Sequence, residues 1–346
     1  MNKKVALASD NGSSAHPLIM RAVMEANEGE ALSYGADRWT LEAQQLIRET
    51  FKRDCKVLIV PTGTGANVLA LTLCCERHES VICTDISHIN YQESGAAEAI
   101  VGCKLVTVPH RQGKVTPKEL LKRLQRERAF GCHSTSPRLL SITQPTEVGT
   151  IYSLEELDAL AFCCKEEGLL LHIDGSRLYN AAVSLKRGLD ELLGSLGVSI
   201  LSLGGTKNGL MGAEALLLFD PMLAPGADYL QKQTLQLMSK MRYLSAQYIP
   251  FFKEELWRTL AKQANQKAQE IASILEAIPS VSWSYPVETN QLFFVPPPAW
   301  IPFLQERISC HLWDREKGEL RFIASWNTSE EDVSAVYSIF SQLANG

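Results

Sequence analysis

The sequence lacks the features by which several large protein classes are recognised. Its 346 residues carry a formal net charge of −5, so there is no excess of positive charge to attract nucleic acid or an anionic membrane. No apolar run approaches the roughly 20 residues of a membrane-spanning helix. Neither a Walker A motif nor a GxGxxG fingerprint is present, and no repeat or low-complexity segment stands out. We therefore expect a globular protein with neither nucleic acid nor a membrane as its partner.

The cysteines also fail to match a secreted or zinc-binding protein. There are nine of them, an odd number, and no CxxC spacing occurs. An odd count argues against a disulfide framework, and the missing CxxC argues against a structural zinc site. The N-terminal stretch MNKKVALASDNG holds only the short apolar run VALA, which we interpret as a first strand and not as a signal peptide. The sequence thus predicts reduced, buried thiols in a cytoplasmic protein without a metal site.

What is present over most of the chain is an alternation of short apolar runs and helical patterns. The runs have strand length and are apolar at successive positions, which is typical of strands buried on both faces. Two of the intervening helices have capping-box starts, at Thr116 and at Ser153. The pattern predicts an α/β domain with a mostly parallel mixed sheet covered by helices. Its strands are expected at 56–60, 80–84, 104–108, 138–142, 169–173, 199–203 and 214–219.

After about residue 225 the alternation gives way to longer helical patterns and a few late strands. Such a mixture is typical of a small α+β domain packed on the large one. We therefore predict a large domain of residues 1–245, which includes the N-terminal segment, and a smaller C-terminal α+β domain of residues 246–346. The expected elements of this last part are helices over 225–275, strands at 281–285, 290–295 and 319–325, and a final helix opened by Thr328.

A glycine-rich turn after the first of the sheet strands is a candidate anion site. In PTGTGANVLAL, Gly63 and Gly65 permit close approach of the backbone, and Thr64 offers a hydroxyl. A helix is expected to begin near Ala66, and the free amides and dipole at a helix N-terminus attract phosphate. Turns of this kind are common, so the stretch alone carries no conclusion.

Two charged residues follow the ends of later predicted strands, where α/β sheets bind their ligands. Asp174 ends the strand in LLLHIDGSR, and Lys207 lies in GGTKNG. Each alone could be an ordinary capping or solvated side chain. Together with the anion site they indicate pyridoxal 5'-phosphate, carried covalently by Lys207 and held protonated at its pyridine nitrogen by Asp174. In this interpretation the glycines around Lys207 make room for the cofactor.

Longer stretches of the chain resemble the low-specificity threonine aldolases, which have PLP fold type I, the aspartate-aminotransferase-like fold. They run over nearly the whole length: SDNGSSAHP, YGADRWT, GTGANVLAL, SHINYQESGAAE, LLSITQPTEVGTIY, LHIDGSRLYNA, GGTKNG, KQTLQLMSKMRYLSA and LRFIASWNT. The resemblance implies a dimeric or tetrameric enzyme that cleaves threonine or allo-threonine into glycine and an aldehyde. The alternatives are a β-eliminating lyase on the same fold and a non-catalytic protein of this fold, against which the presence of Lys207 and Asp174 weighs.

The resemblance also implies roles for two histidines and two arginines. His88 would lie flat over the cofactor ring, and His133 would meet the substrate hydroxyl and help to remove its proton. Arg177 and Arg321 would grip the substrate carboxylate, a task that suits the bidentate guanidinium group. Arg177 could instead form a structural salt bridge with Asp174, which precedes it by three residues.

Further residues complete the expected site. Ser13 would contact the substrate, although the N-terminal loop is two residues longer than the family form SDTVTRP, which leaves Ser14 as an alternative. Tyr34 and Arg242 would reach the substrate or the phosphate, in their own subunit or in a neighbouring one. The remaining histidines are expected to be structural. The cofactor-binding residues implied are Gly63, Thr64, Gly65, His88, Asp174, Lys207 and Arg242.

Overall fold

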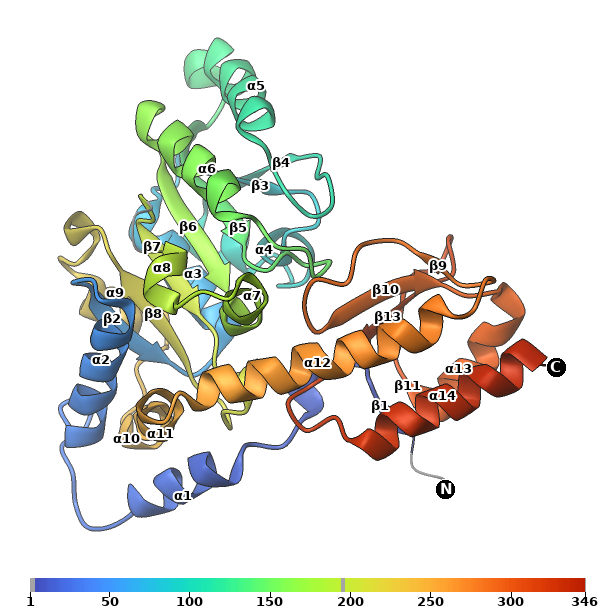
Figure 1. The fold of residues 1–346 in the computed structure, drawn as a ribbon. Helices are drawn as coiled ribbons and strands as arrows, with labels where there is room; N and C mark the ends of the chain where they lie inside the picture. Colours follow the sequence, from blue (N-terminus) through green and yellow to red (C-terminus); the bar gives the residue numbers. More distant parts are fainter. Residues whose placement is uncertain (1–3, 194–196, 346) are drawn as a thin grey trace.

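A computed structural model describes residues 4–193 and 197–345. The ends of the two predicted domains, residues 1–3 and 346, lie outside the described residues. Figure 1 shows a large α/β part and a smaller part beside it, with the long helix α12 running from one to the other.

A seven-stranded sheet forms the centre of the large part, in the order β2-β8-β7-β6-β5-β3-β4. Within this sheet β8 runs antiparallel to both neighbours, and the other pairs are parallel. The predicted mostly parallel mixed sheet is confirmed. Its strands are β2 Lys56–Val60, β3 Glu79–Thr84, β4 Lys104–Val108, β5 Ser136–Thr143, β6 Leu170–Gly175, β7 Ile200–Leu203 and β8 Glu214–Leu218.

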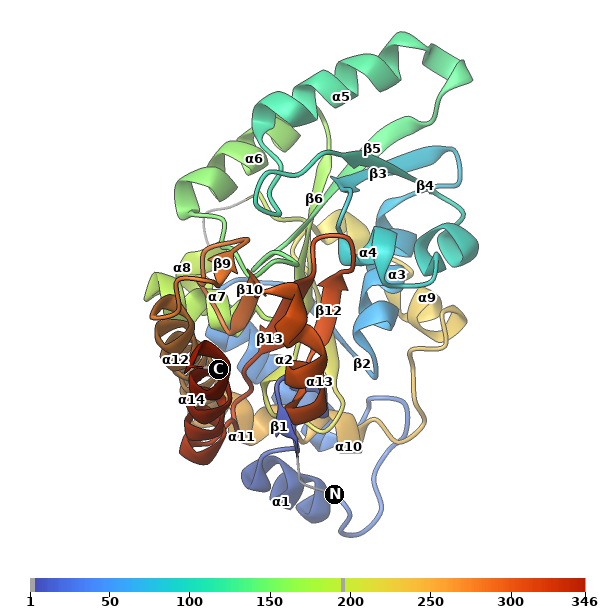
Figure 2. The ribbon, with the colours of Figure 1, turned by 90° about the vertical axis from the view of Figure 1, so that its right-hand side faces the viewer.

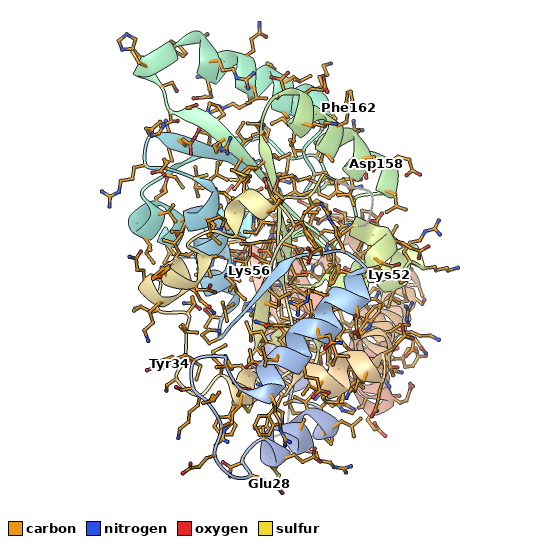
Figure 3. The ribbon with its side chains drawn as sticks, turned by 90° about the vertical axis from the view of Figure 1, so that its left-hand side faces the viewer. Glu28, Tyr34, Lys52, Lys56, Asp158 and Phe162 are labelled. Atoms are coloured by element: carbon orange, nitrogen blue, oxygen red, sulfur yellow. The ribbon has the colours of Figure 1, made fainter. Side chains whose placement is uncertain are left out.

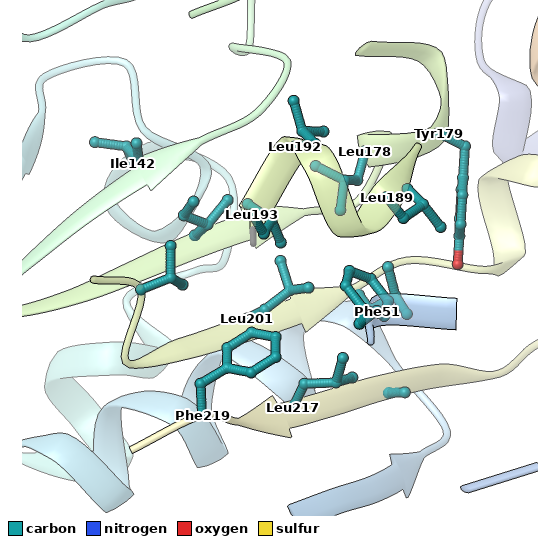
Figure 4. Packing of buried hydrophobic residues seen from close by; sticks show 14 of the residues in the cluster. Phe51, Ile142, Leu178, Tyr179, Leu189, Leu192, Leu193, Leu201, Leu217 and Phe219 are labelled. Carbon is teal, nitrogen blue, oxygen red and sulfur yellow. The ribbon is translucent and has the colours of Figure 1, made fainter. Parts of the chain in front are cut away.

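Both faces of the sheet are covered because successive side chains of its strands are apolar. Along β2, Val57 and Ile59 join one hydrophobic cluster, whereas Leu58 and Val60 join the cluster on the opposite face. Figure 4 shows part of the first cluster, in which Phe51 lies near the sheet residues. Helices on this face are α2 Arg38–Phe51, α5 Pro117–Ala129, α6 Leu154–Glu166, α7 Leu178–Leu185, α8 Leu189–Leu193 and α11 Tyr248–Lys253. On the other face lie α3 Gly63–Cys74, α4 His88–Tyr91, the π-helix Ala97–Val101 and α9 Ala227–Gln233.

The two predicted capping-box starts at Thr116 and Ser153 are confirmed, whereas the helix expected to begin near Ala66 begins at Gly63. In α5 and α6 the hydroxyl and the carboxylate of each capping box form the expected reciprocal hydrogen bonds. The prediction that α14 (Glu330–Asn345) opens at Thr328 is wrong by one residue. Ser329 and Asp332 exchange the capping bonds, whereas the Thr328 hydroxyl accepts a bond from the amide of Ser325.

The smaller part contains a four-stranded antiparallel sheet in the order β12-β13-β10-β9 (Figure 2). The predicted strands near 282, 291 and 319 are confirmed, and β12 is an additional strand. Its sequence HLWD is short and polar at both ends, so it shows no strand pattern, yet it pairs with β13 around a bulge. The strands are β9 Ser282–Trp283, β10 Gln291–Val295, β12 His311–Asp314 and β13 Glu319–Ile323.

The helices between the two parts differ from the long ones predicted over 225–275. Only α12 (Leu256–Glu276) is long, because the chain first turns through α9, α10 (Arg242–Ser245) and α11. The segment 234–241 between α9 and α10 is not helical. The small part is completed by α13 (Ile301–Arg307) and α14.

The N-terminal segment packs against the smaller part. The predicted first strand is confirmed as β1 (Val5–Ala6), which pairs in parallel with β11 (Ile308–Ser309) and not with the large sheet. Val5 and Leu7 belong to the hydrophobic cluster formed by α12, α14 and β10. The chain then passes through a short 3-10 helix, Asp10–Gly12, to α1 (Pro17–Glu25). The domain boundary at residue 245 stays a prediction.

The sequence predicts reduced, buried thiols and no membrane-spanning segment. All nine cysteines are free, and seven of them are buried. Within residues 4–193 and 197–345, no helix has the length and apolar character needed to cross a membrane. The cytoplasmic setting stays a prediction.

Candidate active site

The carboxyl ends of the parallel strands meet at one edge of the large sheet, and two adjoining cavities lie there. The smaller has a volume of about 110 Å³ and the larger about 270 Å³. β6 brings Asp174 to this edge, and β7 runs into the turn that carries Lys207. The two cavities share the residues Asn11, His88, Ser176 and Lys207.

The larger cavity lies at the N-terminus of α3. Thr62 begins this helix, because its Oγ1 accepts a hydrogen bond of 3.0 Å from the amide of Gly65. Gly63 and Thr64 line the cavity. A Cβ atom at Gly65 would lie 2.0 Å from Oε1 of Gln236, so the missing side chain lets Gln236 cover the first turn of the helix.

Asp174 is a buried carboxylate with both oxygens engaged. Oδ2 accepts from Nδ2 of Asn67 at 2.9 Å, and Oδ1 accepts from the amide and the hydroxyl of Ser176 at 2.9 and 2.7 Å. Burial by itself would raise the pKa of Asp174, but His88, Lys207 and these donors together hold that pKa below its ordinary value. Asp174 therefore stays ionised at neutral pH and can hold a proton on a bound cation.

His88 begins α4 beside this carboxylate. Its Nδ1 lies 2.7 Å from Oε1 of Glu93, and its backbone amide donates to Oε1 of Glu147. Donor atoms of His88, Glu93 and Asp174 lie within 4.8 Å of one another. Hydrogen bonds account for this proximity, since Nδ2 of Asn67 donates to both carboxylates.

Lys207 lies in the 3-10 turn Thr206–Asn208 and lines both cavities. Burial and the positive charge of Arg177 lower the pKa of Lys207, against the opposing effect of the carboxylates around it. A lowered pKa increases the fraction of neutral amine, which is the form that attacks a carbonyl carbon.

The glycines beside Lys207 serve a different purpose from the one predicted. A Cβ at Gly204 would lie 2.3 Å from the backbone oxygen of Ser176, and one at Gly205 would lie 2.4 Å from that of Ala213. These glycines allow two backbone segments to pack closely and do not make room for a cofactor. Gly212 lines the larger cavity with open space around it.

Arg177 lines the smaller cavity, and its partner is Asp10. Nε and Nη2 of Arg177 donate to the two oxygens of Asp10 at 2.6 and 2.8 Å, and Asn290 donates to the same carboxylate at 3.1 Å. The alternative pairing of Arg177 with Asp174 is therefore wrong. Burial would raise the pKa of Asp10, but Arg177 holds that pKa below its ordinary value.

Arg321 enters the same cavity from β13. Its Nη2 donates to the backbone oxygen of Ala8 at 3.3 Å, and its guanidinium carbon lies 4.8 Å from the centre of the Trp313 ring. Its Nε is buried and has no partner among the described residues. Burial and the charge of Arg177 lower the pKa of Arg321 to about 10. An anion in this cavity would relieve the repulsion between the two arginines.

Known proteins share both the sequence and this architecture. A model of the beta-eliminating lyase family matches residues 6–296. The low specificity L-threonine aldolase of Pseudomonas aeruginosa is 39% identical over 331 residues, which cover 94% of each chain. The chain belongs to the beta-eliminating lyase family and, within it, to the low specificity L-threonine aldolases.

Solved structures agree with this assignment. The threonine aldolase of Leishmania major matches with a TM-score of 0.93 and 31% identity, covering 98% of this chain and 99% of that one. An aspartate aminotransferase of Thermus thermophilus matches with a TM-score of 0.72 at 13% identity, covering 98% of this chain and 91% of that one. This more distant likeness concerns the fold alone and confirms the predicted aspartate-aminotransferase-like architecture.

In this member of the threonine aldolases, some predicted residues lie elsewhere. The structure does not bring His133 to the cavities, because His133 is exposed in the 3-10 turn Gly131–His133 before β5, whereas Thr143 at the other end of β5 lines the smaller cavity. An eight-residue strand spans about 23 Å. The assignment of His133 to the substrate hydroxyl is therefore wrong within one chain.

The predicted contact of Ser13 with substrate is also corrected. The hydroxyl of Ser13 donates to the backbone oxygen of Asp10 at 2.7 Å, and Ser13 does not line either cavity. Ser9 and Asn11 line the smaller one instead. Ser9 begins the same stretch SDNGSSAHP, but its local sequence does not distinguish it from Ser13 and Ser14.

Tyr34 and Arg242 face away from the cavities of their own chain. Tyr34 is 51% exposed in the loop before α2, where Figure 3 shows it at the surface. Nζ of Lys232 lies over its ring. Arg242 donates to the backbone oxygen of Gly29 at 3.0 Å and to the hydroxyl of Tyr243 at 3.2 Å.

Several residues that line the smaller cavity were not predicted from the sequence. All of them except Gln291 belong to the stretches that resemble the threonine aldolases, but nothing in their local pattern distinguishes them from other loop residues. One of the expected structural histidines is confirmed: His172 is buried between the hydroxyls of Ser141 and Ser202. The unforeseen residues of the smaller cavity are Ser9, Asn11, Gln92, Thr143, Pro145, Thr146, Glu147, Ser176 and Gln291.

Proposed function

We propose that this chain is a pyridoxal 5'-phosphate-dependent aldolase that cleaves threonine and allo-threonine into glycine and an aldehyde. The observation that carries the proposal is the meeting of Lys207, Asp174 and Arg321 at one pair of cavities. An amine, a strand-end carboxylate and an unsatisfied guanidinium are the groups that a cofactor of this kind and an amino acid carboxylate require.

The residues around the larger cavity fit the cofactor. Gly63 and Thr64, at the start of α3, would hold its phosphate. Lys207, which lines both cavities, would carry it covalently, and Asp174, which lines the smaller cavity, would keep its ring nitrogen protonated. Oδ1 of Asn67 is buried beside this site without a partner, as expected of a pocket shaped for a polar ligand. When bound, pyridoxal phosphate supplies an electron sink for the pair released at the substrate α-carbon.

The smaller cavity suits the amino acid. Arg321 and Arg177 would bind the substrate carboxylate through their guanidinium groups, and Nη1 of Arg177 makes no hydrogen bond to the described residues. Asp10 holds Arg177 in place for this contact. His88, which lines both cavities, would lie against the cofactor ring and turn the substrate toward the smaller cavity.

The proposal includes a homo-oligomer. Tyr34 and Arg242 belong to stretches that resemble ligand-contacting segments of the threonine aldolases, yet both face away from the cavities of their own chain. In an oligomer, Tyr34 and Arg242 would line the active-site cavity of a neighbouring subunit. We infer a dimer or tetramer whose active sites contain residues from two chains.

A product assay tests the reaction. The purified protein, loaded with pyridoxal phosphate, is incubated with L-threonine, and glycine, acetaldehyde, ammonia and 2-oxobutanoate are measured. Equal amounts of glycine and acetaldehyde are expected, and the variant Lys207→Ala should form neither. Ammonia and 2-oxobutanoate would instead support β-elimination, the alternative favoured by the description of the family.

A further inference from the structure

Cleavage of a β-hydroxy amino acid needs a base for the hydroxyl proton, and His133 does not reach the site within its chain. The smaller cavity holds one carboxyl group to which no role has been given, that of Glu147. The inference drawn from it rests on the aldolase function proposed above.

Glu147 is anchored through one oxygen and free at the other. Oε1 accepts from Oγ1 of Thr143 at 2.6 Å and from the backbone amide of His88 at 2.9 Å. Oε2 has no hydrogen-bond partner among the described residues and is not among the buried unpaired atoms. Because Glu147, Arg177 and Arg321 line one cavity, a substrate held there by its carboxylate would share that cavity with the carboxyl group of Glu147.

We propose that Glu147 is the catalytic base that takes the proton from the β-hydroxyl of the substrate. The O–H bond breaks and its proton passes to Oε2, while its electron pair forms the C=O bond of the aldehyde. The Cα–Cβ bond breaks, and its electron pair is left at Cα until a proton adds there. One proton leaves oxygen and one is gained by carbon, so glycine and the aldehyde contain every atom of the substrate.

The surroundings make Glu147 a better base than the other carboxylate of the cavity. Burial raises the pKa of Glu147, and the negative charge of Asp174 raises it further. The hydroxyl of Thr143 and the backbone amides of His88 and of Glu147 itself oppose this rise in pKa only in part. Cys83 and Tyr152 are the other titratable groups that feel its charge. A base is most effective when its pKa lies near the working pH. Asp174, with its lowered pKa and two occupied oxygens, is poorly suited to this task.

A purely structural role for Glu147 is the competing explanation. Ser87 makes no side-chain cap for α4, so Oε1 of Glu147 supplies an acceptor for the first amide of that helix and thereby positions His88. Two variants separate the roles. Glu147→Gln keeps an oxygen acceptor for this amide but cannot take a proton, whereas Glu147→Ala loses both functions.

The experiment compares two reactions of the loaded enzyme. Threonine cleavage requires removal of the hydroxyl proton, and exchange of the α-protons of glycine with deuterated water does not. In Glu147→Gln, kcat for threonine should fall about 100-fold or more with KM little changed, while glycine exchange stays near the wild-type rate. In Glu147→Ala both should fall, because His88 is displaced.

A measurement without cofactor or turnover completes the test. Infrared difference spectra of the cofactor-free protein during acidification should contain a protonated-carboxyl band that Glu147→Gln lacks. Its midpoint should lie above the ordinary range of glutamate and match the pH at which wild-type kcat declines. A base must be ionised, so cleavage is lost as pH falls through this midpoint.

Three outcomes would overturn the proposal. Near-normal cleavage by Glu147→Gln excludes a base role, and an equal loss of cleavage and glycine exchange in that variant assigns Glu147 to positioning His88. A missing carboxyl band over the pH range in which cleavage declines also excludes it. If the wild-type protein forms no glycine and aldehyde from threonine, the proposed aldolase function is wrong. This outcome differs from the other three because it appears in the wild-type protein, whereas they appear only when variants are compared with an active wild type.

Discussion

Arg177 and Arg321 occupy the same cavity but are held in different ways. Arg177 has a bidentate pair with the buried Asp10, whereas Arg321 has a single long bond to a backbone oxygen and a stacking contact with Trp313. Removing one partner of a buried charge pair leaves an uncompensated charge, which is strongly destabilising. The two arginines should therefore respond differently to the same substitution.

We predict that Arg321→Lys raises KM for threonine and leaves the folded protein nearly unchanged. Losing one charge-assisted hydrogen bond costs about 1.5–3 kcal/mol, or roughly ten- to a hundredfold in apparent affinity. Arg177→Lys should raise KM and also lower the melting temperature, because its fork no longer matches Asp10. Steady-state kinetics and thermal unfolding measure both effects. An unchanged KM in Arg321→Lys would leave the carboxylate clamp without support.

Glu214 is a buried carboxyl group whose protonation should affect stability. It lines the larger cavity, and its Oε2 accepts a hydrogen bond of 2.6 Å from the amide of Gly205. Burial raises the pKa of Glu214 from 4.5 to about 7, although Thr206 and Lys207 oppose the shift. Between these two values the folded protein binds more protons than the unfolded chain, so this group makes the free energy of unfolding fall as pH rises.

We predict that Glu214→Gln removes the pH-dependent contribution of this carboxyl group to the free energy of unfolding. The shift corresponds to about 3 kcal/mol, lost between about pH 4.5 and pH 7. Urea unfolding of the cofactor-free wild-type protein and of the variant over this pH range gives the difference between their free energies of unfolding. Carboxyl groups with lowered pKa contribute with the opposite sign, but they are present in both proteins and cancel in the difference. The free energy of unfolding of the variant, relative to that of the wild type, should increase steadily as pH rises. A difference that does not vary with pH would contradict the assignment.

At the scale of elements, the turn after β7 depends on two backbone segments packing without side chains between them. We predict that Gly204→Ala destabilises the protein strongly, because its Cβ would lie 2.3 Å from the backbone of Ser176, which has no freedom to rotate away. Gly212→Ala is the matched control, since open space surrounds that position. Thermal unfolding should rank Gly204→Ala well below the control. Equal melting temperatures would show that the turn relaxes easily.

The elements that could be predicted are those whose stability is encoded locally. β2 and β8 are apolar at successive positions, and the capping boxes of α5 and α6 are written in four residues each. β12 could not be predicted, because its pairing with β13 is set by a neighbour that comes later in the chain. Within the break at 234–241, Gln236 lies against Gly65 at the start of α3, a contact that no local pattern reveals.

The residues of the site likewise divide into those that the local sequence predicts and those that only the folded chain reveals. Asp174 and Lys207 follow predictable strands, so their meeting could be foreseen from the rule that ligands bind at strand ends. Asp10 and Arg177 are 167 residues apart, and only the folded chain reveals that they pair. Glu147 is one of several polar residues in a loop, and its importance comes from the cavity that it faces.

At the scale of the whole molecule, one cavity collects residues from three regions. Ser9 and Asn11 come from the N-terminal segment, Glu147 from the large sheet region and Arg321 from the small sheet. β1 fixes the N-terminal segment to β11, so the first residues of the chain and the small part are positioned together. The relation of the small part to the large one therefore determines the distance between the two arginines.

The remaining parts of the proposed site should come from a second subunit. Arg242 belongs to a short helix whose side chains contact the loop after α1, on the surface of its own chain. If Arg242 completes a neighbouring site, Arg242→Ala should fold normally and lose most activity. Lys207→Ala also lacks activity, but its defect concerns the site in its own chain.

Mixing these two inactive variants tests whether sites are shared. After reversible dissociation and reassembly of a dimer from equal amounts, half of the dimers are hybrids. In each hybrid, one site combines the intact Lys207 of one chain with Arg242 of the partner subunit. About a quarter of all sites should then be complete, and a comparable fraction of wild-type activity should return. If both residues acted within a single chain, every site in the mixture would stay defective, so mixing that restores no activity would refute the shared site.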